Sequence, residues 1–287
     1  MRPGAASAQL ALRNAIERLE HTGIHEPTAS AEVLLSELLG IRRAEIAVHN
    51  EPLTGEQAER YEAWICRRLK REPVQRILGY AYFRNLVLDL HEETLIPRPD
   101  TESVVEAALE RIDQSGGSCR VLDIGTGSGA IAISIAQERP LCEVHATDTS
   151  EVALQIARRN AERVGSKVHF HRADVASNLE SLENSVDLLI SNPPYVQSSE
   201  IPELAPEVCK WDPHAALDGG PDGLAYYRRI FAETPPLLRD GADVVLEVGD
   251  GKADAVLELG SRAGFDPLGS RTDLAGTPRA VLLLWER

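Results

Sequence analysis

The segment Asn192-Pro193-Pro194-Tyr195 holds the residues of this chain whose types point most directly to chemistry. Its two prolines have no backbone N–H to donate and they stiffen the segment. The groups that remain are acceptors, the side-chain carbonyl of Asn192 and the backbone carbonyl of Pro193. An NH2 group bound there would donate one hydrogen to each carbonyl, and Tyr195 would stack on the planar group. The segment therefore predicts a site for a planar amide or amino nitrogen.

Such acceptors suit a nitrogen that is a poor nucleophile, because the lone pair of an amide is delocalised into its carbonyl. Hydrogen bonds to both N–H groups favour the positive charge that builds on the nitrogen during attack, and they fix the direction of the lone pair. This chemistry needs no cysteine nucleophile and no acid–base histidine pair. The expected catalytic residues are Asn192, Pro193 and Tyr195, and the expected substrate contacts are Asn192, Pro193, Pro194 and Tyr195.

A glycine-rich segment, Val121 to Gly129, is typical of a strand, a tight turn and the start of a helix. Its glycines permit positive φ angles and let a ligand approach the backbone. Dinucleotide sites favour a different glycine spacing and place a pyrophosphate at the helix N-terminus. Asp123, directly before the turn, would repel a pyrophosphate but can accept hydrogen bonds around a cationic amino acid group. The turn therefore favours S-adenosylmethionine over NAD, bound by Asp123, Gly125, Thr126, Gly127, Ser128 and Gly129.

Two further acidic residues end the strands that follow this turn. Asp148 lies about 20 positions beyond the turn, where a carboxylate can accept both ribose hydroxyls. Asp174 could reach the adenine amino group, with Val175 packed on the ring. The alternatives are a turn that only closes a strand–helix joint, and aspartates that are simply solvated.

A regular alternation of strands and helices positions these residues. The pattern predicts strands at 119–124, 143–147, 167–171, 186–191, 242–247 and 280–285, and helices at about 128–138, 150–164, 224–238 and 251–264. This alternation indicates an α/β fold of the Rossmann-like kind, with a mostly parallel sheet. Ligands bind at the carboxyl ends of such strands, so the glycine turn and the Asn192 loop are expected at one edge.

The first part of the chain is expected to be helical. Apolar residues recur at helical spacing, Gly23 and Gly40 mark helix ends, and Thr54 or Gly55 could cap a helix over 57–69. The basic cluster Arg67, Arg68, Lys70 and Arg71 is typical of a solvated helix end, and the alternative is a docking surface for an acidic partner. Alternation within 80–90 predicts a β-hairpin, and a helix is expected over 101–112.

Composition narrows the possible partners and compartment. Of the net charge of −15, residues 1–72 contribute −1, so the predicted catalytic part is strongly acidic. Direct nucleic-acid binding is therefore disfavoured, because it depends on basic groups at phosphates. The four cysteines are scattered without metal-ligand spacing, so no metal site is expected. The chain has no apolar run of membrane-spanning length and no signal peptide, which predicts a cytoplasmic protein without a membrane partner.

A resemblance to a known family rests on three segments. These are the glycine-rich turn, the Asn192 loop and the block Leu95-Ile96-Pro97-Arg98-Pro99-Asp100-Thr101-Glu102. The chain resembles class I S-adenosylmethionine methyltransferases, and within them the release-factor glutamine methyltransferases, the PrmC/HemK family. The segments 72–79, 212–224 and 273–276 are similar to that family as well. Two positions differ, because many relatives have Glu-Pro at Asp212-Pro213 and an aromatic residue at Val175.

This resemblance implies the substrate. It is the glutamine of the Gly-Gly-Gln motif in class 1 peptide chain release factors, methylated at the side-chain nitrogen N5 during the cycle of translation termination. The resemblance divides the chain into a helical release-factor-binding domain over 1–75, a β-hairpin linker over 76–98 and a methyltransferase domain over 99–287. It places cofactor contacts on Gly125 to Gly129, Asp148, Val175 and Asn192.

The block around Arg98 also has an interpretation from its residues alone. Its prolines favour an extended entry, Asp100 or Thr101 could cap the next helix, and Arg98 could pair with a carboxylate at the sheet edge. Its expected role is mainly architectural. The rival functions are an adenine-N6 methyltransferase acting on DNA or RNA, whose flipped base would stack on Tyr195, and a catalytically silent binding module.

Overall fold

The computed structural model describes residues 7–49, 51–273 and 275–287, which form two compact units. The first unit contains the chain up to Gly79 together with Pro206–Trp211, and the second contains Tyr80–Ala205 and Asp212–Arg287. This division differs from the predicted ranges of 1–75, 76–98 and 99–287. The hairpin is part of the second unit, and a short segment from far along the chain belongs to the first.

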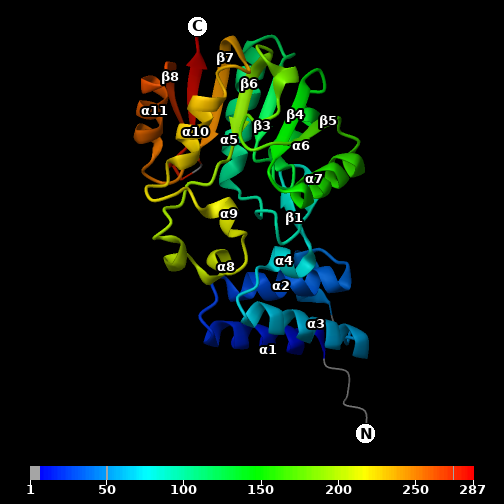
Figure 1. Ribbon diagram of the computed structural model, residues 1–287. Coiled ribbons are helices and arrows are strands. Elements are labelled where there is room, and N and C mark those ends of the chain that lie inside the picture. The colour runs from blue at the N-terminus through cyan, green and yellow to red at the C-terminus, as the bar shows by residue number, and fades with distance from the viewer. Residues whose placement is uncertain (1–6, 50, 274) are drawn as a thin grey trace. The chain divides into compact units, whose positions relative to one another are not determined.

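The first unit is helical, and neighbouring helices α1, α2 and α3 pack on one another (Figure 1). Thr54 begins α3 with a capping box, in which its side chain accepts from the Gln57 N–H and the Gln57 side chain accepts from the Thr54 N–H. Gly40 ends α2 at a φ of 65°. The predicted cap and the predicted helix end are confirmed. The elements are α1 (Ala8–His21), α2 (Pro27–Leu39), the 3-10 helix η1 (Arg43–Val48), α3 (Gly55–Leu69), α4 (Val74–Leu78) and α8 (Pro206–Cys209).

The basic cluster at the end of α3 is not simply a solvated helix end. Arg68 is only 5% exposed, and its Nη1 lies 3.0 Å from Oε1 of Glu207. Arg71 binds the same carboxylate oxygen at 3.1 Å, and Arg67 pairs with Glu72. The prediction of a solvated end is therefore wrong for Arg68. The carboxylate that neutralises it lies more than a hundred residues along the chain and could not be paired with it from spacing.

The second unit begins with the predicted hairpin of β1 (Tyr80–Phe83) and β2 (Leu86–Asp89). Phe83, Leu86 and Leu88 are buried, whereas Tyr82 and Val87 are exposed, as expected for alternating strand faces. The hairpin is joined to α7 (Glu151–Val164) by Asn160, whose Oδ1 accepts from the Asp89 N–H at 2.9 Å.

A seven-stranded sheet forms the centre of this unit, in the order β5-β4-β3-β6-β7-β9-β8 (Figure 1). The predicted α/β fold is confirmed, and β9 is the strand that runs antiparallel to both neighbours. The elements are α5 (Asp100–Gln114), β3 (Arg120–Ile124), α6 (Ala130–Glu138), β4 (Glu143–Asp148), α7 (Glu151–Val164), β5 (Val168–Arg172), η2 (Glu180–Leu182), β6 (Val186–Ser191), η3 (Ile201–Glu203), α9 (His214–Leu217), α10 (Ala225–Glu233), β7 (Leu238–Glu247), α11 (Ala253–Arg262), β8 (Phe265–Thr272) and β9 (Pro278–Trp285).

Two details of this unit differ from the pattern read along the sequence. The helix expected over 224–238 ends at Glu233, because Pro235 and Pro236 cannot continue it. β7 then begins earlier than expected, with an irregular register around Gly241. β8 was missed, since it contains Pro267 and Gly269 and is mostly exposed, as edge strands often are.

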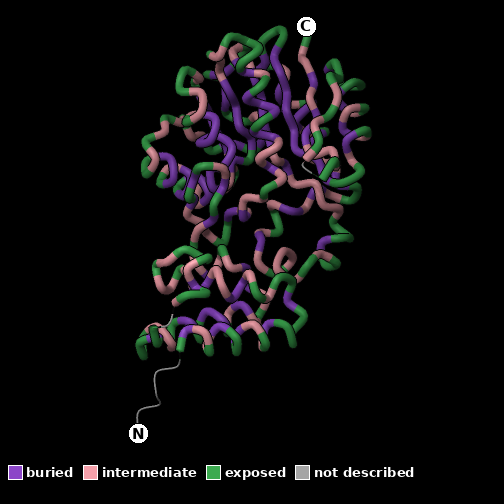
Figure 2. Tube along the Cα trace, turned by 180° about the vertical axis from the view of Figure 1, so that it is seen from behind, coloured by how far each residue is buried: buried purple, intermediate pink, exposed green. Residues whose placement is uncertain are grey.

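Both faces of the sheet are buried. Along β6, Leu188 and Ile190 join one apolar cluster with residues of α5, α6 and α7, while Leu189 joins a second cluster with α10 and α11. Figure 2 shows buried residues concentrated along the strands. A sheet covered on both faces leaves only the ends of its strands open to ligands.

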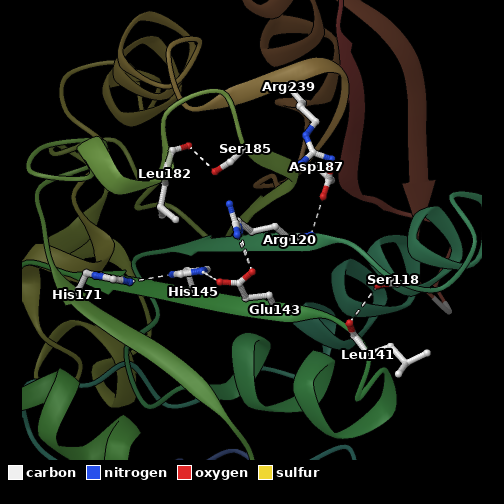
Figure 3. Close-up of polar contacts among 10 residues, drawn as sticks. All are labelled: Ser118, Arg120, Leu141, Glu143, His145, His171, Leu182, Ser185, Asp187 and Arg239. Carbon is white, nitrogen blue, oxygen red and sulfur yellow. Dashed lines mark hydrogen bonds and ion pairs between the residues drawn. The ribbon is translucent and has the colours of Figure 1, made fainter.

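Ion pairs and hydrogen bonds join residues near the amino-terminal ends of the strands (Figure 3). We call this side of the sheet the amino edge. The Arg120 N–H donates to Asp187 Oδ2 at 2.7 Å, and the Arg120 guanidinium pairs with Glu143 at 2.7 Å. Arg239 holds the other oxygen of Asp187 at 2.8 Å. His145 lies between Glu143 and His171. The opposite ends of the strands, the carboxyl edge, carry the predicted site residues.

Candidate active site

The glycine turn after β3 has the conformation that its composition predicted. Gly125, Gly127 and Gly129 have φ angles of 75°, 55° and 87°. A Cβ added at Gly125 or Gly127 would meet no atom within 4 Å, so the backbone is open to a ligand on that side. A Cβ at Gly129 would lie 2.7 Å from Cδ1 of Ile133 and 3.2 Å from Cβ of Ala157, so this glycine packs closely against its neighbours. The turn thus combines one tightly packed glycine with two that face open space.

Hydrogen bonds fix the turn to neighbouring elements. The N–H groups of Gly125 and Thr126 both donate to the Thr147 carbonyl, at 2.9 and 2.8 Å. From the other side, Asn160 Nδ2 donates to the Ser128 carbonyl at 2.9 Å and to the Asp89 carbonyl at 3.1 Å. The turn is therefore held by β4 and, through one fully buried asparagine, by the hairpin.

Asp148, at the end of β4, faces the pocket described below. Its Oδ2 accepts from the Gly127 N–H and its Oδ1 from the Ser150 N–H, each at 2.9 Å. Burial raises the pKa of this carboxyl above its usual value, and the backbone hydrogen bonds oppose that shift. The carboxylate is thus oriented before any ligand binds, as an acceptor for ligand hydroxyls should be.

Asp123 lies behind the turn and does not line the pocket. It is fully buried, its Oδ2 accepts from the Thr126 hydroxyl at 2.7 Å, and its Oδ1 has no hydrogen-bond partner among the described residues. Burial raises the pKa of Asp123 to about 7. Direct contact of Asp123 with a cofactor stays a prediction, and the contact seen is with Thr126.

Asp174 and Val175 line the pocket after β5. Val175 is buried and has a φ of 53°, a rare conformation for a β-branched residue. Asp174 is exposed, and its carboxylate pairs with Arg229 at 2.8 Å. Strained backbone of this kind persists where the surroundings enforce it, commonly at binding sites.

The Asn192 loop follows β6 and reaches the same pocket. The Ser191 hydroxyl donates to the Ile124 carbonyl at 2.6 Å, which joins the ends of β6 and β3. Asn192 Nδ2 donates to Thr101 Oγ1 at 3.2 Å, and Asn192, Pro193 and Pro194 line the pocket. Tyr195 does not line it, because its ring packs against the second apolar cluster. Stacking of Tyr195 on a substrate stays a prediction.

A pocket lies at the carboxyl edge of the sheet, and its lining residues all belong to the second unit. We call it the pocket throughout. These include the glycine turn, the Asn192 loop and three acidic residues, Glu93, Asp148 and Asp174. Among the lining residues that the structure describes, none is Lys, Arg or His. Such a lining would repel a pyrophosphate, whereas it suits S-adenosylmethionine, which carries a sulfonium and an ammonium group.

The block preceding α5 contributes in ways that spacing alone did not reveal. Arg98 pairs with a carboxylate, the buried one of Asp212, but this residue lies in a loop, whereas the expected partner was a carboxylate at the sheet edge. Neither Asp100 nor Thr101 caps α5, because the helix begins at Asp100 with Pro99 as N-cap and no side-chain cap bond. Thr101 instead lines the pocket.

Glu247, at the end of β7, was missed. It is 2% exposed, and its Oε1 accepts from the Tyr195 hydroxyl at 3.4 Å. An acidic residue directly after the apolar run Val244-Val245-Leu246 was the available signal, since it must lie at the carboxyl edge beside the Asn192 loop.

Comparisons with known proteins agree with this geometry. The PrmC N-terminal domain family matches residues 11–79, and the methyltransferase small domain family matches residues 103–211. A release factor glutamine methyltransferase of Geobacter sulfurreducens is 39% identical over 264 residues, covering 92% of this chain and 91% of that protein. One of Bradyrhizobium diazoefficiens is 40% identical over 280 residues, covering 96% and 94%. A solved methyltransferase from Pyrococcus furiosus has the same fold, with a TM-score of 0.51 at 19% identity, covering 79% of this chain and 98% of that one.

The sheet order, the acidic pocket and these matches define a class I methyltransferase, whose methyl donor is S-adenosylmethionine. Within that class, a sequence identity of 39–40% over more than 90% of this chain and of each relative decides the family. The chain belongs to the release factor glutamine methyltransferase family. Within the described part of the chain, none of the helices has the length and apolar character needed to cross a bilayer.

Proposed function

We propose that this enzyme methylates N5 of the glutamine in the Gly-Gly-Gln motif of class 1 peptide chain release factors. The observation that carries the proposal is that Asn192 and Pro193, the two residues that would supply the acceptor carbonyls, both line the pocket. The printed names of relatives at 39–40% identity support the choice of substrate. Release factors act on ribosomes, so we place the reaction in the cytoplasm.

S-adenosylmethionine, when bound, supplies a methyl group on a positively charged sulfur. The proposed cofactor residues fall into two groups. The glycine turn supplies Gly125, Thr126, Gly127, Ser128 and Gly129, and the other residues are Asp123, Asp148, Asp174, Val175 and Asn192. Asp148 is already oriented by two backbone N–H groups and would accept from ribose hydroxyls. Gly125 and Gly127 leave their backbone open to the ligand. The three carboxylates of the lining would favour the positive charges of the cofactor.

The Asn192 loop would hold the substrate nitrogen. Asn192 Nδ2 is engaged by Thr101, which leaves Oδ1 to accept one substrate N–H, and the Pro193 carbonyl would accept the other. Pro194 would stiffen the loop, and Tyr195 would cover the planar amide. Preorganised acceptors stabilise the charge that develops on the nitrogen without reorganising during the reaction.

A transfer assay with matched substrates tests the proposal. Purified enzyme receives methyl-labelled S-adenosylmethionine and one of four acceptors: a class 1 release factor, the same factor with its Gly-Gly-Gln glutamine replaced by glutamate, DNA, or RNA. We expect label only in the unaltered release factor, and mass spectrometry of its peptides should place one methyl group on that glutamine. Label in nucleic acid, with none in the release factor, would instead establish the adenine alternative.

We also propose that the first unit and the hairpin hold the release factor. The hairpin presents Tyr82, 72% exposed, as an apolar contact. Tyr82→Ala should raise KM for the release factor several-fold without changing cofactor affinity. Leu141→Ala is the matched control, because Leu141 is 75% exposed but lies two residues before the start of β4, at the amino edge. Equal KM values for the two variants would remove the hairpin from the docking surface.

A further inference from the structure

Asn160, on α7, is fully buried, and its side-chain amide uses all of its hydrogen-bonding capacity. Its Oδ1 accepts from the Asp89 N–H at 2.9 Å and from Arg163 Nη2 at 3.0 Å. Its Nδ2 donates to the Asp89 carbonyl at 3.1 Å and to the Ser128 carbonyl at 2.9 Å. An asparagine amide has two N–H donors and two acceptor lone pairs, so each of them has a partner here. The reverse orientation would set Nδ2 against two donors, and the amide is therefore held as the structure shows it.

The two carbonyls that Asn160 holds belong to different parts of the second unit. Ser128 is in the glycine turn and lines the pocket. Asp89 is the last residue of β2, where it pairs with Tyr80 of β1. The amide bonds both the N–H and the carbonyl of Asp89, as a residue of a neighbouring strand would. One buried side chain therefore joins the proposed cofactor turn directly to the hairpin.

The chain that leaves the hairpin makes a second connection to the pocket. Glu93 lines the pocket, and its Oε2 accepts from the Ser150 hydroxyl at 2.6 Å. Ser150 also lines the pocket, and it caps α7, the helix that carries Asn160. A two-stranded hairpin is only marginally stable by itself, so its order depends on contacts of this kind. A ligand that fixes the glycine turn should therefore also order the hairpin.

We propose that Asn160 is a positioning residue that couples cofactor binding to the hairpin, so that S-adenosylmethionine and the release factor strengthen each other's binding. The inference rests on the proposed function, because it takes the hairpin as part of the release-factor docking surface. A ligand on the glycine turn restricts the Ser128 carbonyl, and Asn160 passes that restriction to Asp89. The release factor then binds a hairpin that is already ordered, at a smaller cost in conformational entropy. By thermodynamic linkage, each ligand favours the other by the same factor.

Calorimetric titration of the enzyme with release factor, with and without S-adenosylhomocysteine, tests the coupling. This compound occupies the cofactor site but has no methyl group to transfer. The wild-type enzyme should bind the release factor about five- to twentyfold more tightly when the compound is present, within the usual range of coupling between sites. Asn160→Ala should bring the ratio of the two affinities to within about twofold of one, because the connection is lost.

Arg163→Ala is the matched control, because the contacts that the structure describes for Arg163 hold the hairpin and none reaches the glycine turn. Its guanidinium pairs with the Asp89 carboxylate at 2.5 Å and also donates to the Val87 carbonyl. This variant should bind the release factor more weakly in both states but keep the wild-type ratio. Ser134→Ala controls for the loss of a buried hydrogen bond, since the buried Ser134 hydroxyl donates to the Ala130 carbonyl within α6. It should match wild type in both measurements.

Hydrogen exchange tests the same connection inside the enzyme, without a release factor. In the wild-type enzyme, S-adenosylhomocysteine alone should slow the exchange of backbone amides in residues 80–89 several-fold. Amides of β8, at an outer edge of the sheet, should exchange at an unchanged rate. In Asn160→Ala the protection of residues 80–89 should be lost. Should this variant not fold, the wild-type exchange result still decides for or against the coupling.

The outcomes separate this inference from the proposed function. A wild-type affinity ratio near one, hairpin exchange that does not respond to S-adenosylhomocysteine, or a ratio that survives in Asn160→Ala would overturn the coupling while leaving release-factor methylation intact. Equal loss of the ratio in Arg163→Ala would overturn the particular role of Asn160. Absence of release-factor methylation by the wild-type enzyme would overturn the function itself.

Discussion

The two edges of the seven-stranded sheet are formed by the same strands, yet their polar groups are used in opposite ways. At the amino edge, Arg120, Glu143, Asp187 and Arg239 are partly exposed and joined in ion pairs. At the carboxyl edge, Asp123 and Glu247 are buried, and burial raises the pKa of each to about 7. At the carboxyl edge, the β-branched residue Val175 also has a φ of 53°, a strained backbone conformation for this residue type.

This difference shows that the fold places its energetically unfavourable buried carboxylates at the carboxyl edge. An exposed ion pair is weakly stabilising and tolerant of change, whereas a buried carboxylate is costly unless it is well bonded. Concentrating such groups at one edge is typical of functional sites, which need preoriented acceptors and open backbone. Substitutions at the carboxyl edge should therefore change catalysis, and substitutions at the amino edge should change stability slightly or not at all.

The largest effect is expected from Asn192→Ala. Loss of the acceptor should lower kcat by about 10²- to 10³-fold, the usual result of deleting one preorganised transition-state contact. Affinity for S-adenosylmethionine, measured by calorimetry, should stay within about tenfold, because the glycine turn and Asp148 remain. Wild-type turnover in a folded variant would exclude Asn192 from the reaction.

Two glycines with nearly the same φ allow the edges to be compared directly. Gly223 has a φ of 72°, and a Cβ there would lie 2.4 Å from the Tyr195 carbonyl oxygen. Gly241 has a φ of 78° within β7 near the amino edge, and a Cβ there would meet nothing within 4 Å. Both alanine variants suffer the strain of a positive φ, about 1 kcal/mol, but only Gly223→Ala should displace the Asn192 loop.

We therefore expect Gly223→Ala to lose roughly a hundredfold in kcat, and Gly241→Ala to keep wild-type kcat with a slightly lower melting temperature. Steady-state kinetics with thermal unfolding measures both effects. The contrast between the edges fails if the two variants lose kcat equally.

Asp123→Asn should change the pH dependence of stability. The folded-state pKa is about 7, against an ordinary value of 3.8. Between these values the folded protein holds a proton that the unfolded chain has released, so the wild-type free energy of unfolding falls as pH rises. The slope from one such group is about 1.4 kcal/mol per pH unit. Asparagine cannot ionise, so the variant should gain stability relative to wild type from pH 5 to 7 and hold a constant difference above pH 8.

Denaturant unfolding at pH 5, 6, 7 and 8 without cofactor checks this prediction. A difference between variant and wild type that does not vary with pH would mean that Asp123 titrates normally.

The smallest effect is expected from Glu143→Gln at the amino edge. The Arg120 guanidinium lowers the pKa of this carboxyl, but the Glu143 side chain is 46% exposed. Loss of an exposed pair should cost less than about 1 kcal/mol of unfolding free energy. The kcat and cofactor affinity should equal those of wild type. A clear loss of activity would show that the amino edge communicates with the site.

Several features were predictable because they depend on local chemistry. The glycine turn, the capping of α3 by Thr54 and the sheet strands follow from spacing, propensity and hydrophobic pattern. The site residues Asp148 and Asn192 could be found because parallel strands bring their carboxyl ends to one edge. β8 escaped because an exposed edge strand with proline and glycine lacks a strand pattern.

The sequence by itself determined the type of chemistry, through the acceptors of the Asn192 loop, the glycine turn and the family motifs. Tertiary structure alone decided which partners these groups have. Arg68 pairs with Glu207, Asp123 is buried behind its turn, and Thr101 accepts from Asn192 instead of capping the helix as expected. The physical reason is that burial and hydrogen-bond pairing depend on residues distant in the chain, whereas turns, caps and strand ends depend on neighbours.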